Sequence, residues 1–155
     1  MTTDTRVHFP QLTAMQALVG QHLATSPWVT VSQERINLFA EATGDHQWIH
    51  VDPERAKTGP FGTTIAHGFL TLSLLAGLAD RSFVINDVRM GVNYGLNKVR
   101  FTSPVPAGSR VRLRMKLLEA TPIEGGLQLA WQSTIEREGA DKPACIAESL
   151  ARYFV

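Results

Sequence analysis

The stretch "HGFLTLSLLAGLADRSF", residues 67–83, decides the fold class. It contains no proline, and as a helix it would carry apolar side chains on nearly every face. A helix that is apolar all round is expected to be buried all round. The stretch falls short of the roughly 20 apolar residues that cross a bilayer, so protein must surround it.

The rest of the sequence supplies strands that could surround this helix. In "VRLRMKL" (111–117) and "LQLAWQSTI" (127–135), apolar residues alternate with polar ones, and a Gly-Gly pair lies between the two segments. Such alternation is typical of a hairpin of antiparallel strands with one buried face. Residues 89–101 and 144–155 are further strand candidates. We therefore predict an α+β fold, one domain over 1–155 in which an antiparallel β-sheet wraps a long buried central helix.

Shorter elements precede the central helix. Residues 12–19 have helical spacing, and residues 28–31 have the composition of a strand. Ser32 is expected to cap a helix that ends at Gly44, and Asp52 a short helix with proline in its first turn. Residues 1–10 are expected to be disordered.

Composition excludes several classes of protein. The 155 residues are 44% hydrophobic and 19% charged, which is typical of a globular domain. A net charge of +1 gives no basic field for nucleic acid. The only cysteine, Cys145, cannot form an internal disulfide, and this fits a reducing compartment. With no signal-peptide pattern and no membrane-length apolar run, the protein is expected to be cytoplasmic and to bind neither nucleic acid nor membranes.

The segment "GDHQWIHVD", residues 44–52, holds a cluster of polar side chains that could bind a metal. His46 and His50 are four residues apart, which would place both on one face of a helix, and His67 is a candidate third ligand. The glycine at position 44 ends the preceding helix, however, and "QWIHVDP" is expected to be extended. We therefore expect no metal site.

Proton transfer is the second interpretation of this segment. Asp45 and His50 can converge from a turn between two helices, and a carboxylate and an imidazole that share a water form an acid–base pair near neutral pH. From spacing alone another interpretation stays open, in which Asp45 caps local backbone amides and His50 is an ordinary loop residue.

Gly68 stands in the first turn of the predicted central helix. N–H groups in the first turn have no intrahelical partner and carry the positive end of the helix dipole. A glycine there lets a ligand carbonyl approach the backbone, so that the amide could polarise an oxyanion. Alternatively, Gly68 is small because the sheet presses close to it, and both statements can hold together.

These segments, in this order, resemble the (R)-specific enoyl-CoA hydratases, also called MaoC-like dehydratases. The stretch that matches best is "FAEATGDHQWIHVDPERAKTGPFGTTIAHGFLTLSLL", residues 39–75, and segments on both sides of it are also similar. The resemblance implies a hot-dog domain, usually a homodimer, that acts on acyl thioesters of coenzyme A. It implies no metal or redox cofactor, because coenzyme A arrives as part of the substrate.

The family's catalytic aspartate and histidine correspond to Asp45 and His50, and its oxyanion-binding amide corresponds to Gly68. The reaction implied is the reversible addition of water to a trans-2-enoyl-CoA, which gives a (3R)-3-hydroxyacyl-CoA. The commonest family motif is Asp-x-Asn-Pro-x-His, whereas Gln47 and Trp48 stand here at the Asn-Pro positions. This variation resembles a nodulation-factor-like subgroup and changes the turn between the catalytic residues.

Further residues are candidates for contact with the substrate. The family's serine that supports the aspartate has no secure counterpart, although Ser73 is on the corresponding helix. The other polar or cationic candidates are His67, Asn93, Tyr94, Lys98 and Arg100. Candidates for the lining of an acyl tunnel are Trp48 and Phe61. The alternating Arg110, Arg112 and Arg114 are interpreted as a solvated strand face.

Two other functions compete with hydration. Hot-dog domains also serve as acyl-CoA thioesterases, for which a lone carboxylate on the central helix would be expected, but the only acid on that helix is Asp80 near its end. The third candidate is a non-catalytic acyl-binding subunit. The presence of Asp45, His50 and Gly68 together favours the enzyme.

Overall fold

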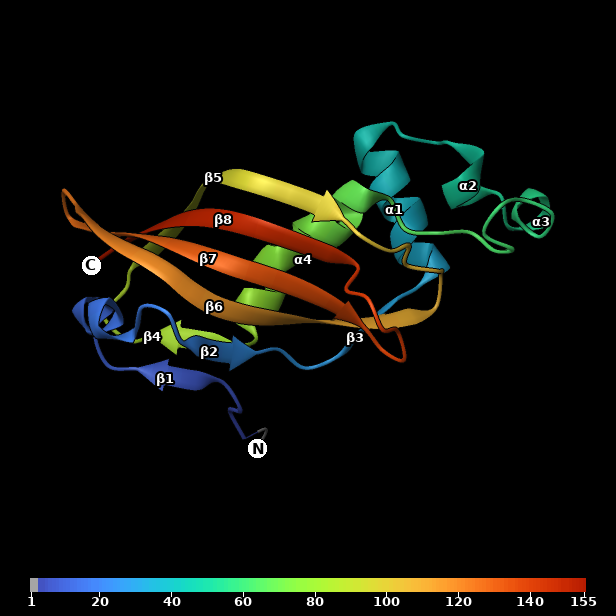
Figure 1. Cartoon of the computed structure of the whole chain (residues 1–155). Coiled ribbons are helices and arrows are strands. Elements are labelled where there is room, and N and C mark those ends of the chain that lie inside the picture. The colour runs from blue at the N-terminus through green and yellow to red at the C-terminus, as the bar shows by residue number, and fades with distance from the viewer. Residues whose placement is uncertain (1–2) are drawn as a thin grey trace.

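The computed structural model describes residues 3–155 and is built around one curved sheet with a helix across its inner face (Figure 1). The sheet is antiparallel, with strand order β2-β6-β7-β8-β5, and β3 also pairs with β6. Its strands are β2 (His22–Thr25), β3 (Val29–Val31), β5 (Met90–Phe101), β6 (Ser109–Ile123), β7 (Gly126–Arg137) and β8 (Cys145–Phe154). The helix is α4 (Gly68–Asp80). The predicted α+β arrangement is confirmed.

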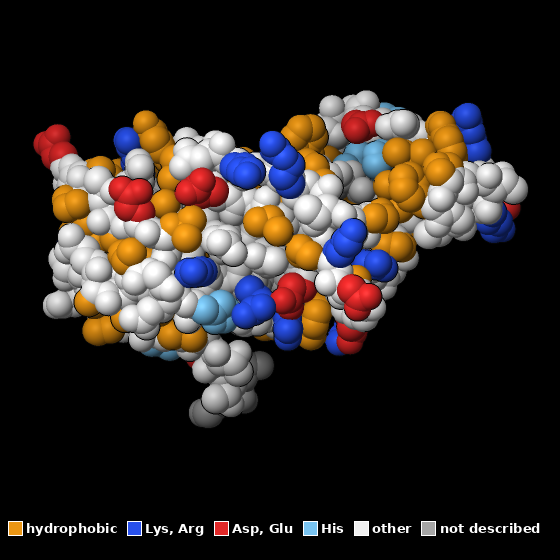
Figure 2. All heavy atoms as spheres, in the orientation of Figure 1, with side chains coloured by type: hydrophobic (Ala, Val, Ile, Leu, Met, Phe, Trp, Pro, Cys, Tyr) orange, Lys and Arg blue, Asp and Glu red, His pale blue; other side chains and the backbone are white. Residues whose placement is uncertain are grey.

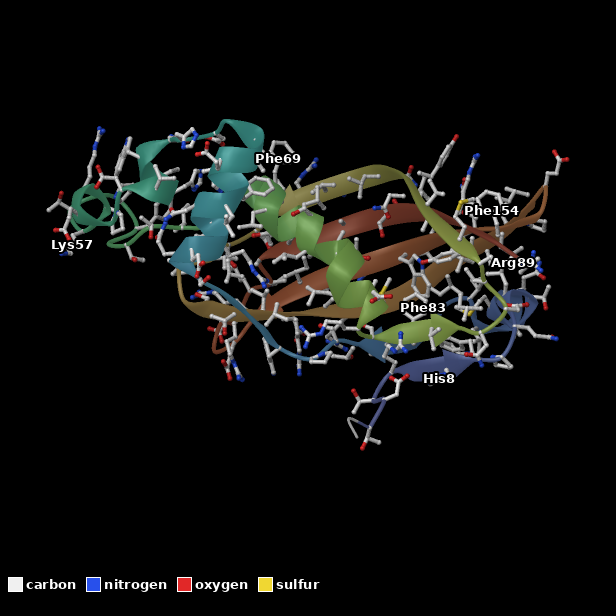
Figure 3. All side chains as sticks on the ribbon, turned by 180° about the vertical axis from the view of Figure 1, so that it is seen from behind. His8, Lys57, Phe69, Phe83, Arg89 and Phe154 are labelled. Atoms are coloured by element: carbon white, nitrogen blue, oxygen red, sulfur yellow. The ribbon has the colours of Figure 1, made fainter. Side chains whose placement is uncertain are left out.

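The alternation in β6 and β7 has the predicted structural consequence. Buried apolar side chains of both strands share the inner face of the sheet, and the core contains Leu113, Leu117, Leu129, Trp131 and Ile135. Seen from behind, α4 lies against this face (Figure 3). Polar residues between the apolar ones stay on the outer face, so the sequence period of two sets which side of the sheet is dry.

The helix α4 is not buried all round, and that prediction is wrong for the single chain. Leu70, Thr71 and Leu78 are buried, but Phe69 is 71% exposed at the N-terminal end of the helix (Figure 3). The physical reason is that the sheet covers only one side of α4. The edge strand β5 has a similar character, because large apolar side chains along it are exposed, among them Val92.

The short elements agree with their predicted caps. A 3-10 helix, η1, spans Leu12–Leu18. In α1 (Gln33–Thr43) the Ser32 side chain accepts a hydrogen bond from the Arg35 N–H, and Gly44 ends the helix at a φ of 80°. In α3 (Pro53–Ala56) the cap is the Asp52 carboxylate.

The N-terminal segment differs from the prediction. Val7–Phe9 form strand β1, which pairs in parallel with β4 (Phe83–Ile85), so the expected disorder is wrong from residue 7 onward. Phe9 is buried and packs edge-on against Phe83, which supplies the apolar contact that orders the segment. Residues 1–2 of the predicted disordered segment lie outside the described residues. Among the described residues, no helix combines the length and apolar character needed to cross a membrane.

Candidate active site

The segment between α1 and α3 is a helical turn and not the extended chain that was predicted. After Gly44 the chain forms α2 (Trp48–Val51), which is closed by a hydrogen bond from the Asp52 N–H to the Trp48 carbonyl. The proline at position 53 excludes helix only from the residue just before it, and this leaves room for one turn. The turn directs His50 inward, so that this residue is only 7% exposed.

Three polar side chains meet next to this turn. Asp45, His50 and His67 each place one nitrogen or carboxylate oxygen within 4.8 Å of the others. His67 immediately precedes α4, and its ring stacks on that of His50 with 3.9 Å between centroids and 25° between planes. The structure therefore brings Asp45 and His50 together with the start of the central helix. His46 is not in this group and lies 3.8 Å from Glu41.

His50 is held in the state that a general base requires. Its Nδ1 lies 2.7 Å from the carbonyl oxygen of Ile65, and because a carbonyl can only accept, Nδ1 carries the proton. Nε2 of the neutral ring is then free to accept a proton. Burial lowers the pKa of His50, against the opposing effects of the Ile65 carbonyl and the Asp45 charge. The ring is thus neutral at pH 7.

Asp45 combines the two roles that the sequence left open. Its Oδ1 accepts a hydrogen bond of 3.3 Å from the Gln47 N–H, which is the local capping role. Its side chain is nevertheless exposed and close to both histidines, so oxygen lone pairs remain for a water or a substrate. Its main-chain carbonyl accepts a hydrogen bond of 2.9 Å from His67 Nε2.

A supporting residue that sequence reasoning missed is Gln33, in the first turn of α1. Its Nε2 donates to the His50 carbonyl at 2.7 Å, and its Oε1 accepts a hydrogen bond from the Thr64 hydroxyl. Gln33 therefore connects α1, α2 and the loop before α4. It is 17 positions from His50 in the chain, and no local sequence pattern signals a contact over that distance.

Gly68 has both properties that its position suggested. A Cβ at this residue would lie 3.1 Å from the ring of Phe101, so a side chain here would have to displace that ring. Its N–H is in the first turn of α4, where no intrahelical acceptor exists. Gly68 directly follows His67, whose ring stacks on that of His50, so this amide is next to the histidine pair in the chain.

The three side chains lie close enough together to hold a metal ion, but the stacking of the two histidine rings does not favour one. Two imidazole rings that stack face to face direct their in-plane lone pairs side by side, whereas a tetrahedral metal needs donors that converge. One nitrogen of each ring is used in a hydrogen bond to a carbonyl, His50 Nδ1 to Ile65 and His67 Nε2 to Asp45, and the other nitrogen makes no hydrogen bond with a described residue. The expectation that no metal is required stays a prediction.

A cavity of about 300 Å³ lies between α4 and the inner face of the sheet. Leu72 and Ser73 of α4 line it, as do Asn93 and Tyr94 of β5. The Ser73 hydroxyl donates to the Leu70 carbonyl at 2.8 Å, so in this structure it is bonded to its own helix.

Two aromatic candidates, Trp48 and Phe61, lie outside this cavity. Phe61 is exposed in a shallow depression beside Gly68 and Phe101. Trp48 lies under the Arg55 guanidinium, which is 4.3 Å from the centroid of the ring. The unusual residue of the motif therefore stabilises the α2–α3 turn in the single chain.

The basic candidates lie on the opposite face of the sheet from α4. Lys98 pairs with Glu148 and Arg100 with Ile146, while the intervening Ala147 is buried against the core. Paired residues share a face, so both cations point away from the cavity. On this outer face basic and acidic side chains are interspersed (Figure 2). The outer face includes ion pairs from each of the three alternating arginines of β6, namely Arg110–Glu138, Arg112–Glu136 and Arg114–Glu136.

Comparison with known proteins gives relatives along nearly the whole chain. The chain is 53% identical over 146 residues to 3-hydroxyacyl-thioester dehydratase Z of Mycobacterium tuberculosis. The alignment covers 94% of this chain and 97% of the relative. It is 47% identical over 148 residues to nodulation protein N of Rhizobium meliloti, with 94% and 92% covered.

Solved structures share the fold. The R-hydratase PhaJ1 from Pseudomonas aeruginosa superposes with a TM-score of 0.72 at 24% identity, over 87% of this chain and 81% of that one. A similar match, with a TM-score of 0.71 at 22% identity, is the (R)-hydratase from A. caviae, over 86% of this chain and 94% of that one. The family described as MaoC like domain matches residues 14–131. The chain therefore belongs to the MaoC-like dehydratase family and has its hot-dog fold.

Proposed function

We propose that this hydro-lyase catalyses the reversible hydration of trans-2-enoyl-CoA to (3R)-3-hydroxyacyl-CoA. The observation that carries the proposal is the meeting of the Asp45 carboxylate, the neutral His50 ring and the N-terminus of α4. The dehydratase name of the 53% identical relative supports the same reaction class, since dehydration of a 3-hydroxyacyl thioester is this reaction in reverse.

Each residue has a defined part in the proposed reaction. The Gly68 N–H donates to the thioester carbonyl oxygen and withdraws electrons from the conjugated double bond, so the β-carbon becomes electrophilic. Asp45 and His50 Nε2 hold a water between them. As the water oxygen bonds to the β-carbon, its proton passes to the dyad and the double-bond electrons form an enolate. A proton from the dyad then adds to the α-carbon, so that one water is added in all.

The cavity beside α4 is the proposed place for the acyl chain. The first residue of α4 that lines it is Leu72, four residues after Gly68, which corresponds to about 6 Å of helix rise. A thioester carbonyl at Gly68 would therefore direct a longer acyl group along α4 and under the sheet. Apart from Ser73, the cavity wall on the helix side is apolar, which suits a hydrocarbon chain.

The direct test follows the absorbance of the conjugated thioester in crotonyl-CoA with wild type, Asp45→Ala and His50→Ala. Each variant is expected to lose at least about two orders of magnitude in kcat, because each loses an acid–base group. His46→Ala is the matched control, since this exposed histidine of the same segment lies outside the group and should leave kcat unchanged. Full activity in both site variants would refute the dyad. Cleavage of an acyl-CoA without hydration would indicate a thioesterase.

We further propose that the chain forms a homodimer through β5. This strand pairs only with β8 within the described sheet, and Val92, Tyr94 and Leu96 on it are exposed. An edge strand with exposed apolar side chains is normally covered by another chain. The expected mass in solution is twice the 17.1 kDa of one chain. A mass of a single chain at micromolar concentration would contradict the dimer, and Leu96→Lys should weaken it.

A further inference from the structure

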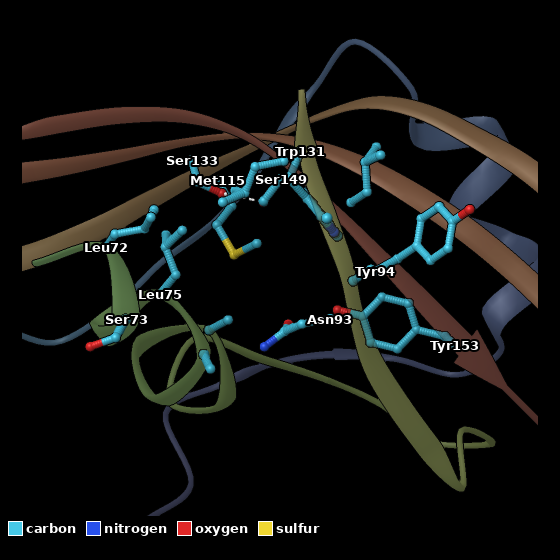
Figure 4. A pocket seen from close by; sticks show the side chains of 16 residues that line it. Leu72, Ser73, Leu75, Asn93, Tyr94, Met115, Trp131, Ser133, Ser149 and Tyr153 are labelled. Atoms are coloured by element: carbon cyan, nitrogen blue, oxygen red, sulfur yellow. Dashed lines mark hydrogen bonds between the residues drawn. The ribbon is translucent and has the colours of Figure 1, made fainter. Parts of the chain in front are cut away.

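The sheet side of the cavity beside α4 is more polar than a hydrocarbon chain requires. In Figure 4, Leu72 and Leu75 come from α4, whereas Trp131, Ser133 and Ser149 come from the facing strands. These three residues lie on the inner face of β7 and β8, where the other positions of the core are apolar. Polar groups in such a place need a partner.

Trp131 offers a hydrogen-bond donor that no protein group uses. Its side chain is only 1% exposed, and its Nε1 makes no hydrogen bond with any described residue. Buried indole N–H groups normally find an acceptor. The Tyr153 hydroxyl lies near this nitrogen, but the two do not form a hydrogen bond of good geometry. The indole N–H is thus left without a hydrogen bond of good geometry in the wall of the cavity.

Ser133 and Ser149 supply a second donor. Their hydroxyl oxygens are 3.1 Å apart, so one hydroxyl donates to the other (dashed line in Figure 4). The accepting hydroxyl keeps its own proton, for which no acceptor is present among the described residues. Burial raises the pKa of Tyr153 to about 12, so its hydroxyl is also protonated at neutral pH.

The charge of the cavity limits the kind of group that these donors can bind. None of the 16 residues that line it is charged. A carboxylate would lose its hydration there without gaining a counter-charge. A neutral oxygen, as in a ketone, an ether or a hydroxyl, would instead accept from the indole N–H or from a serine hydroxyl.

We propose that the preferred acyl group carries a neutral hydrogen-bond-accepting oxygen along its chain, bound by Trp131 and the Ser133–Ser149 pair. This inference rests on the proposed hydration of enoyl thioesters and names the class of substrate for the same site. A short crotonyl group bound at Gly68 would make little contact with these donors, because the first residue of α4 that lines the cavity is Leu72, about 6 Å of helix rise beyond Gly68. Crotonyl-CoA therefore tests hydration without testing the oxygen preference.

The experiment compares kcat/KM for trans-2-enoyl-CoA substrates of equal chain length. One has a hydrocarbon chain, and the others carry an ether or keto oxygen at successive positions beyond the fifth carbon or so, spanning the depth of the cavity. Wild type is expected to favour at least one oxygenated chain over the hydrocarbon by about tenfold or more, as is usual when a buried donor gains its acceptor. Trp131→Phe keeps an aromatic ring but removes the N–H, and should reduce this ratio to about one.

Because both substrates are measured on the same protein, a change in the ratio is independent of how much of the variant folds. Ser133→Ala is the second variant and should lower the ratio in the same direction. A wild type that prefers the hydrocarbon chain at every oxygen position would overturn the inference, as would a ratio that neither variant changes. If wild type does not hydrate crotonyl-CoA either, the proposed function itself fails, and the two failures are thereby separated.

Discussion

His67 gives the sharpest test of how the site is held together. Its ring is only 2% exposed and lies between Phe39, at 4.9 Å between centroids, and His50, at 3.9 Å. Its Nε2 donates to the Asp45 carbonyl. We propose that His67 is a positioning residue for the Asp45–His50 pair. His67→Phe keeps an aromatic ring in the stack but removes the donor, whereas His67→Gln keeps a donor at the position of Nε2.

The expected size of the effect follows from the lost hydrogen bond. Removing one partner of a buried hydrogen bond costs about 1–3 kcal/mol. If the lost hydrogen bond displaces Asp45 and raises the activation free energy by this amount, His67→Phe lowers kcat by about 5- to 150-fold, since 1.36 kcal/mol corresponds to a factor of ten. KM should change little, because His67 does not line the cavity. His67→Gln should restore most of kcat.

The assay is steady-state hydration of crotonyl-CoA by the three proteins, with a thermal melt of each to compare stability. A drop in kcat for His67→Phe with recovery in His67→Gln supports positioning through the hydrogen bond. The reasoning is refuted if His67→Phe retains the kcat of wild type. It is also refuted if the two variants lose kcat equally, because then the donor to Asp45 makes no difference.

Three other outcomes are expected. Burial lowers the pKa of His50 from 6.5, so kcat/KM should fall only below pH 6.5. Because the unfolded chain then binds a proton more readily than the folded one, the melting temperature should also decline below pH 6.5, and more in wild type than in His50→Gln. Gly68→Ala, whose Cβ meets Phe101, should lower kcat, whereas Gly77→Ala, with nothing within 4 Å, should raise stability by about 0.5–1 kcal/mol in a thermal melt. Cys145, buried with its pKa raised to about 11, should resist a thiol reagent until the protein unfolds.

The parts of the fold that the sequence predicted correctly are those with local causes. The cap at Ser32 and the stop at Gly44 depend on residues within one helical turn. The alternation of β6 and β7 depends on which face of each strand is dry, and it extends over a whole strand. The strand pair β1–β4 was missed because three-residue strands are too short to show a period.

The burial of α4 was predicted wrongly for a different reason. An apolar side chain such as Phe69 indicates that its position is unfavourable for contact with water. The side chain alone does not indicate whether the same chain or another chain covers that position. In the site, the segment with Asp45 and His50 was identified from residue types and the family resemblance. Its supports, Gln33 and the Ile65 carbonyl, come from distant positions and depend on tertiary structure.

The hydrogen bonds of the site explain how the segment that contains α2 and the loop before α4 can hold a dyad between them. The His50 ring donates to the Ile65 carbonyl, and the His67 ring donates to the Asp45 carbonyl, so each segment supplies a histidine to the backbone of the other. A backbone bond of 3.0 Å from the Ile65 N–H to the Ile49 carbonyl closes the same junction. Networks of this kind lose more than one bond when a member is removed. It follows that α2 and the N-terminus of α4 should order together, and that the residues which perform the proposed chemistry also set the distance between the acid–base pair and the Gly68 amide.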